Sequence, residues 1–140
     1  MSRFENPSTD EIRALLKRVR TIAVVGLSPK RSRPSHMVAE SLQCFGYRII
    51  PVRPAVESVL GEKAYADLRE LPETPDLVDV FRAPEHVGPL VDECIELGIQ
   101  ALWLQDGVIN DEAALKAQQA GITVIMDRCI YRDYMRLMEI

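Results

Sequence analysis

The chain is 140 residues long, with 47% hydrophobic and 27% charged residues, three cysteines and a formal net charge of −4 at pH 7. This length fits one domain whose core needs no disulfide or metal, and the net negative charge argues against nucleic acid as a partner. The first residues are polar and no apolar run approaches the length of a membrane span, so we expect neither a signal peptide nor a membrane anchor. The widely spaced cysteines are typical of reduced thiols, which predicts a cytoplasmic protein.

Hydrophobic periodicity predicts helices and strands that alternate along the chain. The first helix covers residues 8–19 and begins at a capping box formed by Ser8 and Glu11. The elements that follow are a strand at 21–27, a helix at 34–45, a strand at 47–52, a less regular stretch at 54–76 with a short helix near 67–71, a strand at 77–81, a helix at 84–97, a strand at 101–104, a helix at 111–120, a strand at 123–126 and a helix at 131–138.

This alternation is typical of the α/β class. It predicts a single doubly wound domain over residues 1–140, the first helix included, with helices on both faces of a five-stranded parallel sheet. We expect the strand order 3-2-1-4-5, whose switch point lies between strands 1 and 4. Ligands of such sheets bind at the carboxyl ends of the strands, so the residues directly after each strand become candidates for a binding site.

The stretch at residues 21–35 has the features of a phosphate-binding loop. An apolar strand ends at Gly26, a loop rich in hydroxyl groups and cations follows, and Pro34 can open the next helix. A helix amino terminus presents free N–H groups and a positive dipole end to an anion. Residues 28–53 carry five cations and one anion, although the whole chain is acidic. A basic island of this kind indicates a small anionic ligand rather than a long polyanion.

The residues around this loop argue against NAD as the ligand. After Gly26 the loop has no second or third glycine, so the dinucleotide fingerprint is absent. Arg53 follows the second strand, where NAD enzymes place the carboxylate that receives the ribose hydroxyls. A cation at that position suits a phosphorylated ribose, as in NADP or coenzyme A.

Seven short motifs carry a family resemblance over about residues 15–138. They are VGLSPK at 25–30, RPS at 33–35, IPVRP at 50–54, LGEKAY at 60–65, VDVFR at 78–82, LWLQDG at 102–107 and MDRC at 126–129. In this order they resemble the small stand-alone CoA-binding proteins that are similar to the N-terminal domain of the succinyl-CoA synthetase alpha subunit. The resemblance implies a Rossmann-like fold that holds coenzyme A or acyl-CoA. It also implies that Gly26 to Ser28 lie near the phosphates and Val52-Arg53-Pro54 near the adenosine.

The sequence departs from the family pattern at one position of this site. The usual Pro-Val-Asn-Pro reads Pro-Val-Arg-Pro here, which leaves the contacts of position 53 open, although a guanidinium is suited to the 3′-phosphate of CoA.

These inferences predict a ligand site, with no catalytic and no metal-binding residues. The expected CoA contacts are Gly26, Leu27, Ser28, Lys30, Arg33, Ser35, Val52, Arg53, Pro54, Phe81, Arg82 and Gln105. Alternatives stay open for Ser35, which can cap its helix instead, and for Arg82, which can pair with Glu85. Cys129 follows the last strand at the same edge of the sheet, so a thiol role there is a further alternative.

The leading hypothesis for function is a CoA-binding module with no chemistry of its own. Its ligand is a small molecule, its protein partner is unknown, and neither nucleic acid nor a membrane is expected to bind. The acid–CoA ligases related by the resemblance need further domains, including one with a phosphorylated histidine. Two alternatives remain: a small enzyme that uses NADP or acyl-CoA, and a subunit that supplies a CoA site to a separately encoded ligase partner.

Overall fold

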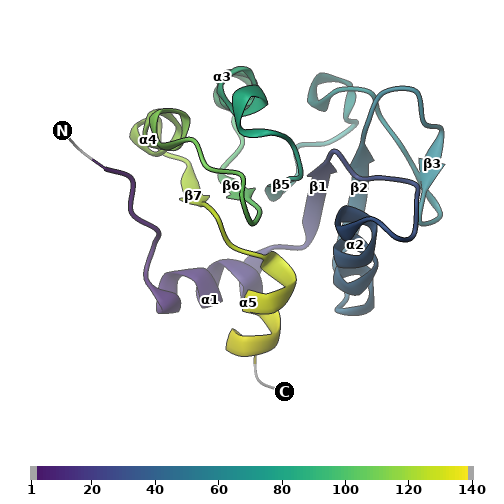
Figure 1. Cartoon of the computed structure of the whole chain (residues 1–140), viewed down its shortest axis with the longest axis horizontal. Helices are drawn as coiled ribbons and strands as arrows, with labels where there is room; N and C mark the ends of the chain where they lie inside the picture. The colour runs from purple at the N-terminus through teal and green to yellow at the C-terminus, as the bar shows by residue number, and fades with distance from the viewer. Residues whose placement is uncertain (1–2, 139–140) are drawn as a thin grey trace.

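The computed structural model describes residues 3–138 as helices and strands that alternate along the chain (Figure 1). The helices are α1 (Thr9–Arg18), α2 (Pro34–Cys44), α3 (Val87–Leu97), α4 (Asp111–Gln119) and α5 (Ile130–Leu137), with short 3₁₀ turns η1 (Leu68–Glu70) and η2 (Pro84–His86). The strands are β1 (Thr21–Val25), β2 (Arg48–Val52), β3 (Ser58–Val59), β4 (Glu62–Lys63), β5 (Leu77–Val80), β6 (Ala101–Leu104) and β7 (Thr123–Ile125). The predicted alternation is therefore confirmed, and the capping box of Ser8 and Glu11 opens α1 as expected.

Five strands form one parallel sheet in the order β2-β1-β5-β6-β7. The α/β class and the five-stranded parallel sheet are confirmed, but the predicted order 3-2-1-4-5 is wrong, because the third strand of this sheet pairs with β1 and not with β2. The reason lies at the outer edge of β2. There the Arg53 N–H donates to the Tyr65 carbonyl at 2.7 Å, and the Tyr65 N–H donates to the Pro51 carbonyl at 3.0 Å. The carboxyl end of this edge is therefore already occupied by the segment around Tyr65, and the next strand pairs on the far side of β1.

A small hairpin is the element that the sequence did not predict. Strands β3 and β4 pair antiparallel within the stretch at 54–76, which was expected to be irregular. Their two-residue turn consists of Leu60 at φ 54° and Gly61 at φ 77°. A turn with two positive φ values is normally marked by Asn-Gly or Asp-Gly, and a leucine at its first position gives no such signal.

The sheet is covered on both faces, as predicted. Helices α1, α2 and α5 cover one face, where Trp103 is part of a buried apolar cluster, and α3 and α4 cover the other (Figure 1). Every residue of β5 and β6 is buried, which is the pattern of central parallel strands. No helix in residues 3–138 is long and apolar enough to cross a membrane.

The corrected order moves the switch point of the sheet. Because β2 and β5 flank β1 on opposite sides, the connections that follow β1 and β5 leave toward opposite faces, and a crevice opens between these two strands. The loops after β1 and β5 therefore meet at this edge of the sheet. Any ligand site in this fold is expected between them.

Candidate anion-binding site

A cavity of about 710 Å³ lies at the carboxyl ends of β1, β5 and β6, at the switch point of the sheet. This volume is within the usual range for small-molecule sites. Of the twelve expected contact residues, nine line it: Gly26, Ser28, Lys30, Arg33, Ser35, Arg53, Phe81, Arg82 and Gln105. Asp106, Val108 and Cys129 extend its wall toward α5.

Gly26 allows the loops after β1 and β5 to approach closely. Its φ is 86°, in the left-handed region, and its N–H donates to the Val52 carbonyl at 2.9 Å. A Cβ atom at this position would overlap the carbonyl oxygen of Phe81. The glycine is therefore required both for its backbone conformation and for the contact with the β5 loop.

Two serine hydroxyl groups stabilise the conformation of the loop after β1, and each still has a hydrogen to donate. The Ser35 Oγ accepts the Ser28 N–H at 3.0 Å, and the Ser28 Oγ accepts the Lys30 N–H at 3.1 Å. Each hydroxyl acts here as an acceptor, so its own O–H remains available to an anion in the cavity. Ser35 is thus not the cap of its helix, because the N-cap residue of α2 is Arg33.

The amino terminus of α2 points its positive end at this loop without compensation. Pro34 occupies the first turn, the N-cap residue makes no side-chain capping bond, and no acidic residue lies in the first turn. The first N–H groups of a helix have no partner within the helix, and together with the dipole they attract anions.

Four cations line the cavity without a carboxylate partner. Within residues 3–138, none of Lys30, Arg33, Arg53 and Arg82 forms an ion pair, whereas seven other basic residues do. The alternative pairing of Arg82 with Glu85 is therefore absent from the described structure. The Arg53 Nη1 donates a long bond of 3.4 Å to the Gly26 carbonyl, which holds the guanidinium over the loop after β1.

Among the described residues, one carboxylate lines this cavity, and it is already neutralised. Asp106 receives two hydrogen bonds from the Arg132 guanidinium, at 2.7 and 2.6 Å. The cavity is consequently positive overall, and an anion of more than one charge would match it.

Three of the expected contacts lie elsewhere. Leu27 is fully buried in the core on the α1/α2/α5 face, and Pro54 is exposed and lines neither cavity described here. Val52 lines a second cavity of about 220 Å³, to which Asp67 and Glu93 contribute carboxyl groups.

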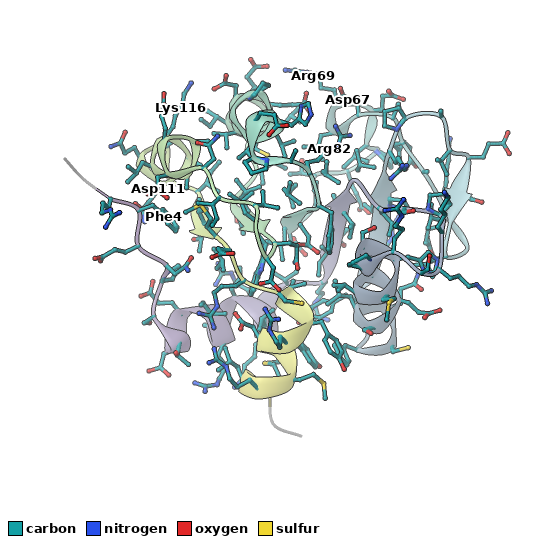
Figure 2. The ribbon with its side chains drawn as sticks, in the orientation of Figure 1. Phe4, Asp67, Arg69, Arg82, Asp111 and Lys116 are labelled. Carbon is teal, nitrogen blue, oxygen red and sulfur yellow. The ribbon has the colours of Figure 1, made fainter. Side chains whose placement is uncertain are left out.

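Arg82 joins the two cavities, since it lines both. Figure 2 shows it on the loop after β5, on the same side of the molecule as Asp67. In the second cavity, burial and a hydrogen bond with Asp67 raise the pKa of Glu93.

Sequence reasoning missed one polar residue beside the main cavity. Asp79 lies at the centre of β5 with no exposed surface, and its Oδ1 accepts a 2.5 Å hydrogen bond from the Gln105 Nε2. Burial raises the pKa of Asp79 to about 7, against the opposing effect of the hydrogen bond from Gln105. The sequence did contain a signal for it, because a carboxylate interrupts the otherwise apolar run Leu77–Val80.

The described residues hold no cluster of His, Cys, Asp or Glu side chains suited to a metal ion. All three cysteines are free thiols, and only Cys129 of the three lines the main cavity.

Comparison with known proteins agrees with this geometry. Residues 20–135 match the family model described as "CoA binding domain". The Bacillus subtilis (strain 168) protein YneT is 44% identical over 127 residues, which cover 91% of this chain and 94% of that protein. The solved structure of a hypothetical protein from Pyrococcus horikoshii OT3 superposes with a TM-score of 0.91 at 34% identity, with 99% of this chain and 100% of that chain covered.

A longer relative is also similar. The ADP-forming acetate–CoA ligase I of Archaeoglobus fulgidus is 22% identical over 121 residues, which cover 79% of this chain but only 18% of the ligase. The match over 116 consecutive residues of this chain, from 20 to 135, decides the assignment: the protein belongs to the CoA-binding domain family.

Proposed function

We propose that this protein binds coenzyme A or acyl-CoA in the 710 Å³ cavity and has no chemistry of its own. The observation that carries the proposal is the set of four cations in that cavity that form no ion pair within residues 3–138, in a member of the CoA-binding domain family. CoA carries a pyrophosphate and a 3′-phosphate, so it offers several negative charges to these groups. The two serine O–H groups and the α2 amino terminus are further donors, and phosphate oxygens accept hydrogen bonds.

The order of the strands suggests how CoA lies across the site. The pyrophosphate would occupy the loop after β1, beside Ser28 and Lys30, and the 3′-phosphate would approach Arg53 after β2. The adenine would then reach the cavity beyond Val52, where apolar side chains such as Leu68 and Leu90 line the wall together with the Asp67 carboxylate, an acceptor for the amino group of the base. The pantetheine arm would run the other way, over β5 toward β6.

A second candidate function is that of a subunit that supplies this CoA site to a ligase partner. The match to only 18% of the Archaeoglobus ligase favours it, because in that relative the corresponding segment is one part of a much longer chain.

Calorimetric titration of the purified chain tests the binding proposal. We expect CoA and acetyl-CoA to bind with similar affinity, because the cations address the phosphates and not the acyl group. NADP and NAD serve as the competing ligands. Tight binding of either dinucleotide with no heat from CoA would contradict the proposal.

Arg53→Ala is expected to weaken CoA roughly ten- to a hundredfold and to leave dephospho-CoA nearly unchanged. A charge-assisted hydrogen bond to a phosphate contributes about 1.5–3 kcal/mol, and dephospho-CoA lacks the phosphate concerned. Arg31→Ala is the control for loss of a positive charge, because Arg31 is an exposed cation of the loop after β1 that does not line the cavity. An equal loss of affinity for CoA and dephospho-CoA would show that Arg53 stabilises the loop and does not contact the 3′-phosphate.

Ligand binding is also expected to protect Cys129 from alkylation. At an acetyl-CoA concentration ten times its Kd, the rate of modification by iodoacetamide should fall about tenfold, because only the free protein reacts. Mass spectrometry of the digested protein supplies two internal controls. Exposed Cys44 should react at the same rate with and without ligand. Cys94 should stay unmodified, since burial raises its pKa to about 12. If Cys129 reacts at an unchanged rate, the ligand does not occupy this part of the cavity.

A further inference from the structure

A buried polar pair lies directly beside the main cavity, on two neighbouring central strands. Asp79 of β5 pairs in register with Trp103 of β6, and Gln105 follows two residues later on the same face of the sheet. Asp79 has no exposed surface and Gln105 is 3% exposed, yet Gln105 contributes to the wall of the cavity. The pair therefore connects the interior of the sheet to the ligand site.

Stability does not account for this pair. The Asp79 Oδ1 accepts one hydrogen bond from Gln105, and the Asp79 Oδ2 is the one fully buried side-chain polar atom without a partner in residues 3–138. A buried carboxyl group with only one of its two oxygens hydrogen-bonded costs free energy of folding. Proteins with well-packed apolar side chains of similar size at such positions are often more stable. An apolar residue at position 79 would continue the apolar run of β5, so the carboxyl needs another explanation.

The hydrogen bond fixes which end of the Gln105 amide faces the ligand. Because Nε2 donates to Asp79, the carbonyl oxygen Oε1, which is bonded to the same carbon, points away from the Asp79 carboxyl. Within residues 3–138 no donor is bonded to Oε1. Because Asp79 Oδ2 is the one fully buried side-chain polar atom there without a partner, Oε1 must retain some exposed surface, and Gln105 lines the cavity. Besides the Asp106 carboxylate, which is engaged by Arg132, the cavity thus has an oriented amide oxygen as an acceptor among its donors.

We propose that Asp79 is a positioning residue, which holds the Gln105 amide so that its carbonyl oxygen accepts a hydrogen bond from an N–H or O–H group of the pantetheine arm of CoA. This inference rests on the proposed function. Phosphate groups at neutral pH offer acceptors only, whereas the pantetheine arm has two amide N–H groups and a hydroxyl. Gln105 follows β6, on the opposite side of the phosphate loop from β2 and Arg53, where the arm would run.

The test compares CoA with its fragment 3′,5′-ADP, which has the nucleotide and its 3′-phosphate and lacks the pantetheine arm together with the phosphate that carries it. Asp79→Leu removes the acceptor that orients Gln105, so the amide can turn its NH₂ group toward the ligand's donor. We expect CoA to bind about three- to tenfold more weakly, as for the loss of one ordinary hydrogen bond, and 3′,5′-ADP to bind as before. Asp79→Asn is the conservative control. It keeps a carbonyl acceptor for the Gln105 Nε2 and should retain the affinity for CoA.

A double-mutant cycle tests whether Asp79 acts through Gln105. Gln105→Met should weaken CoA by a similar factor, and Asp79→Leu should add no further loss in the Gln105→Met protein. The double variant replaces both polar partners by apolar groups, so it keeps the test open if Gln105→Met alone does not fold. Additive losses, an equal loss for CoA and 3′,5′-ADP, or unchanged CoA affinity in Asp79→Leu would each overturn the inference. If the unaltered protein binds neither ligand, the proposed function fails and the inference falls with it.

Discussion

Gly26→Ala is expected to destabilise the protein by about 2–5 kcal/mol and to abolish CoA binding. Two costs add at this position. A non-glycine residue at φ 86° costs roughly 1–2 kcal/mol, and forcing an extra carbon against packed backbone costs roughly 1–3 kcal/mol. The second cost arises because the added Cβ overlaps the Phe81 carbonyl oxygen, which belongs to rigid backbone and cannot turn away like a side chain. Any relief must separate the loops after β1 and β5, and the cavity lies between them.

Gly121→Ala is the matched control for this prediction. Gly121 has a similar φ of 93°, but nothing lies within 4 Å of the position that its Cβ would take. This variant should lose only the conformational part, about 1–2 kcal/mol, and should bind CoA normally. Urea denaturation gives both free energies of unfolding, and titration with CoA gives both affinities. Equal destabilisation by the two substitutions, with CoA binding intact in both, would show that the contact with the β5 loop is unimportant.

The sequence predicted the elements well because each carries a local signal. Periodic apolar residues, the capping box at Ser8 and a glycine after each of several helices mark boundaries that depend on neighbouring residues alone. Strand order carries no such local signal, because it depends on which edge of the sheet is already occupied. The segment around Tyr65 decides this through two backbone hydrogen bonds, and backbone groups have no sequence signature.

The candidate site was predictable where position along a strand determines it. Gly26, Arg53 and Gln105 directly follow their strands, and Arg82 lies two residues after β5. The parallel sheet brings all four to one edge and into one cavity. Leu27 is part of the same loop, but its side chain turns into the core, a detail that loop position cannot reveal.

Asp79 shows how a prediction based only on strand ends falls short. It lies in the middle of β5, beneath the cavity and not at its rim, and its role depends on a partner 26 residues away, Gln105. A charged residue within a strand that is otherwise apolar on both faces is the signal that would have identified it. Such a residue is costly wherever it is buried, so its presence alone calls for a physical explanation.

The pH dependence of stability is expected to come largely from this one carboxyl. Its pKa rises from 3.8 to about 7 on folding, because burial disfavours the charged form. Between these two values the folded state binds more protons than the unfolded state, so the free energy of unfolding falls as pH increases from about 4 to 7 and levels off above. A pKa change of this size corresponds to roughly 4 kcal/mol, since each pKa unit is worth about 1.4 kcal/mol.

Asp79→Leu should therefore remove this slope and stabilise the protein at pH 8, while changing its stability much less at pH 5. Other groups titrate over the same range, so the quantity to measure is the difference in the free energy of unfolding between variant and unaltered protein, from urea denaturation at the two pH values.

Asp79→Asn separates charge from packing. This variant also cannot ionise, so it should remove the slope, yet it keeps a polar group in the interior and should gain less stability at pH 8. If the difference between Asp79→Leu and the unaltered protein is the same at pH 5 and pH 8, Asp79 does not change its protonation on folding. The expected result is that Asp79→Leu gains stability at pH 8 and loses affinity for CoA. The same carboxyl would then weaken the fold and serve the ligand site. Both effects can coexist, because Oδ1 accepts the hydrogen bond from Gln105 whether or not Oδ2 carries the proton.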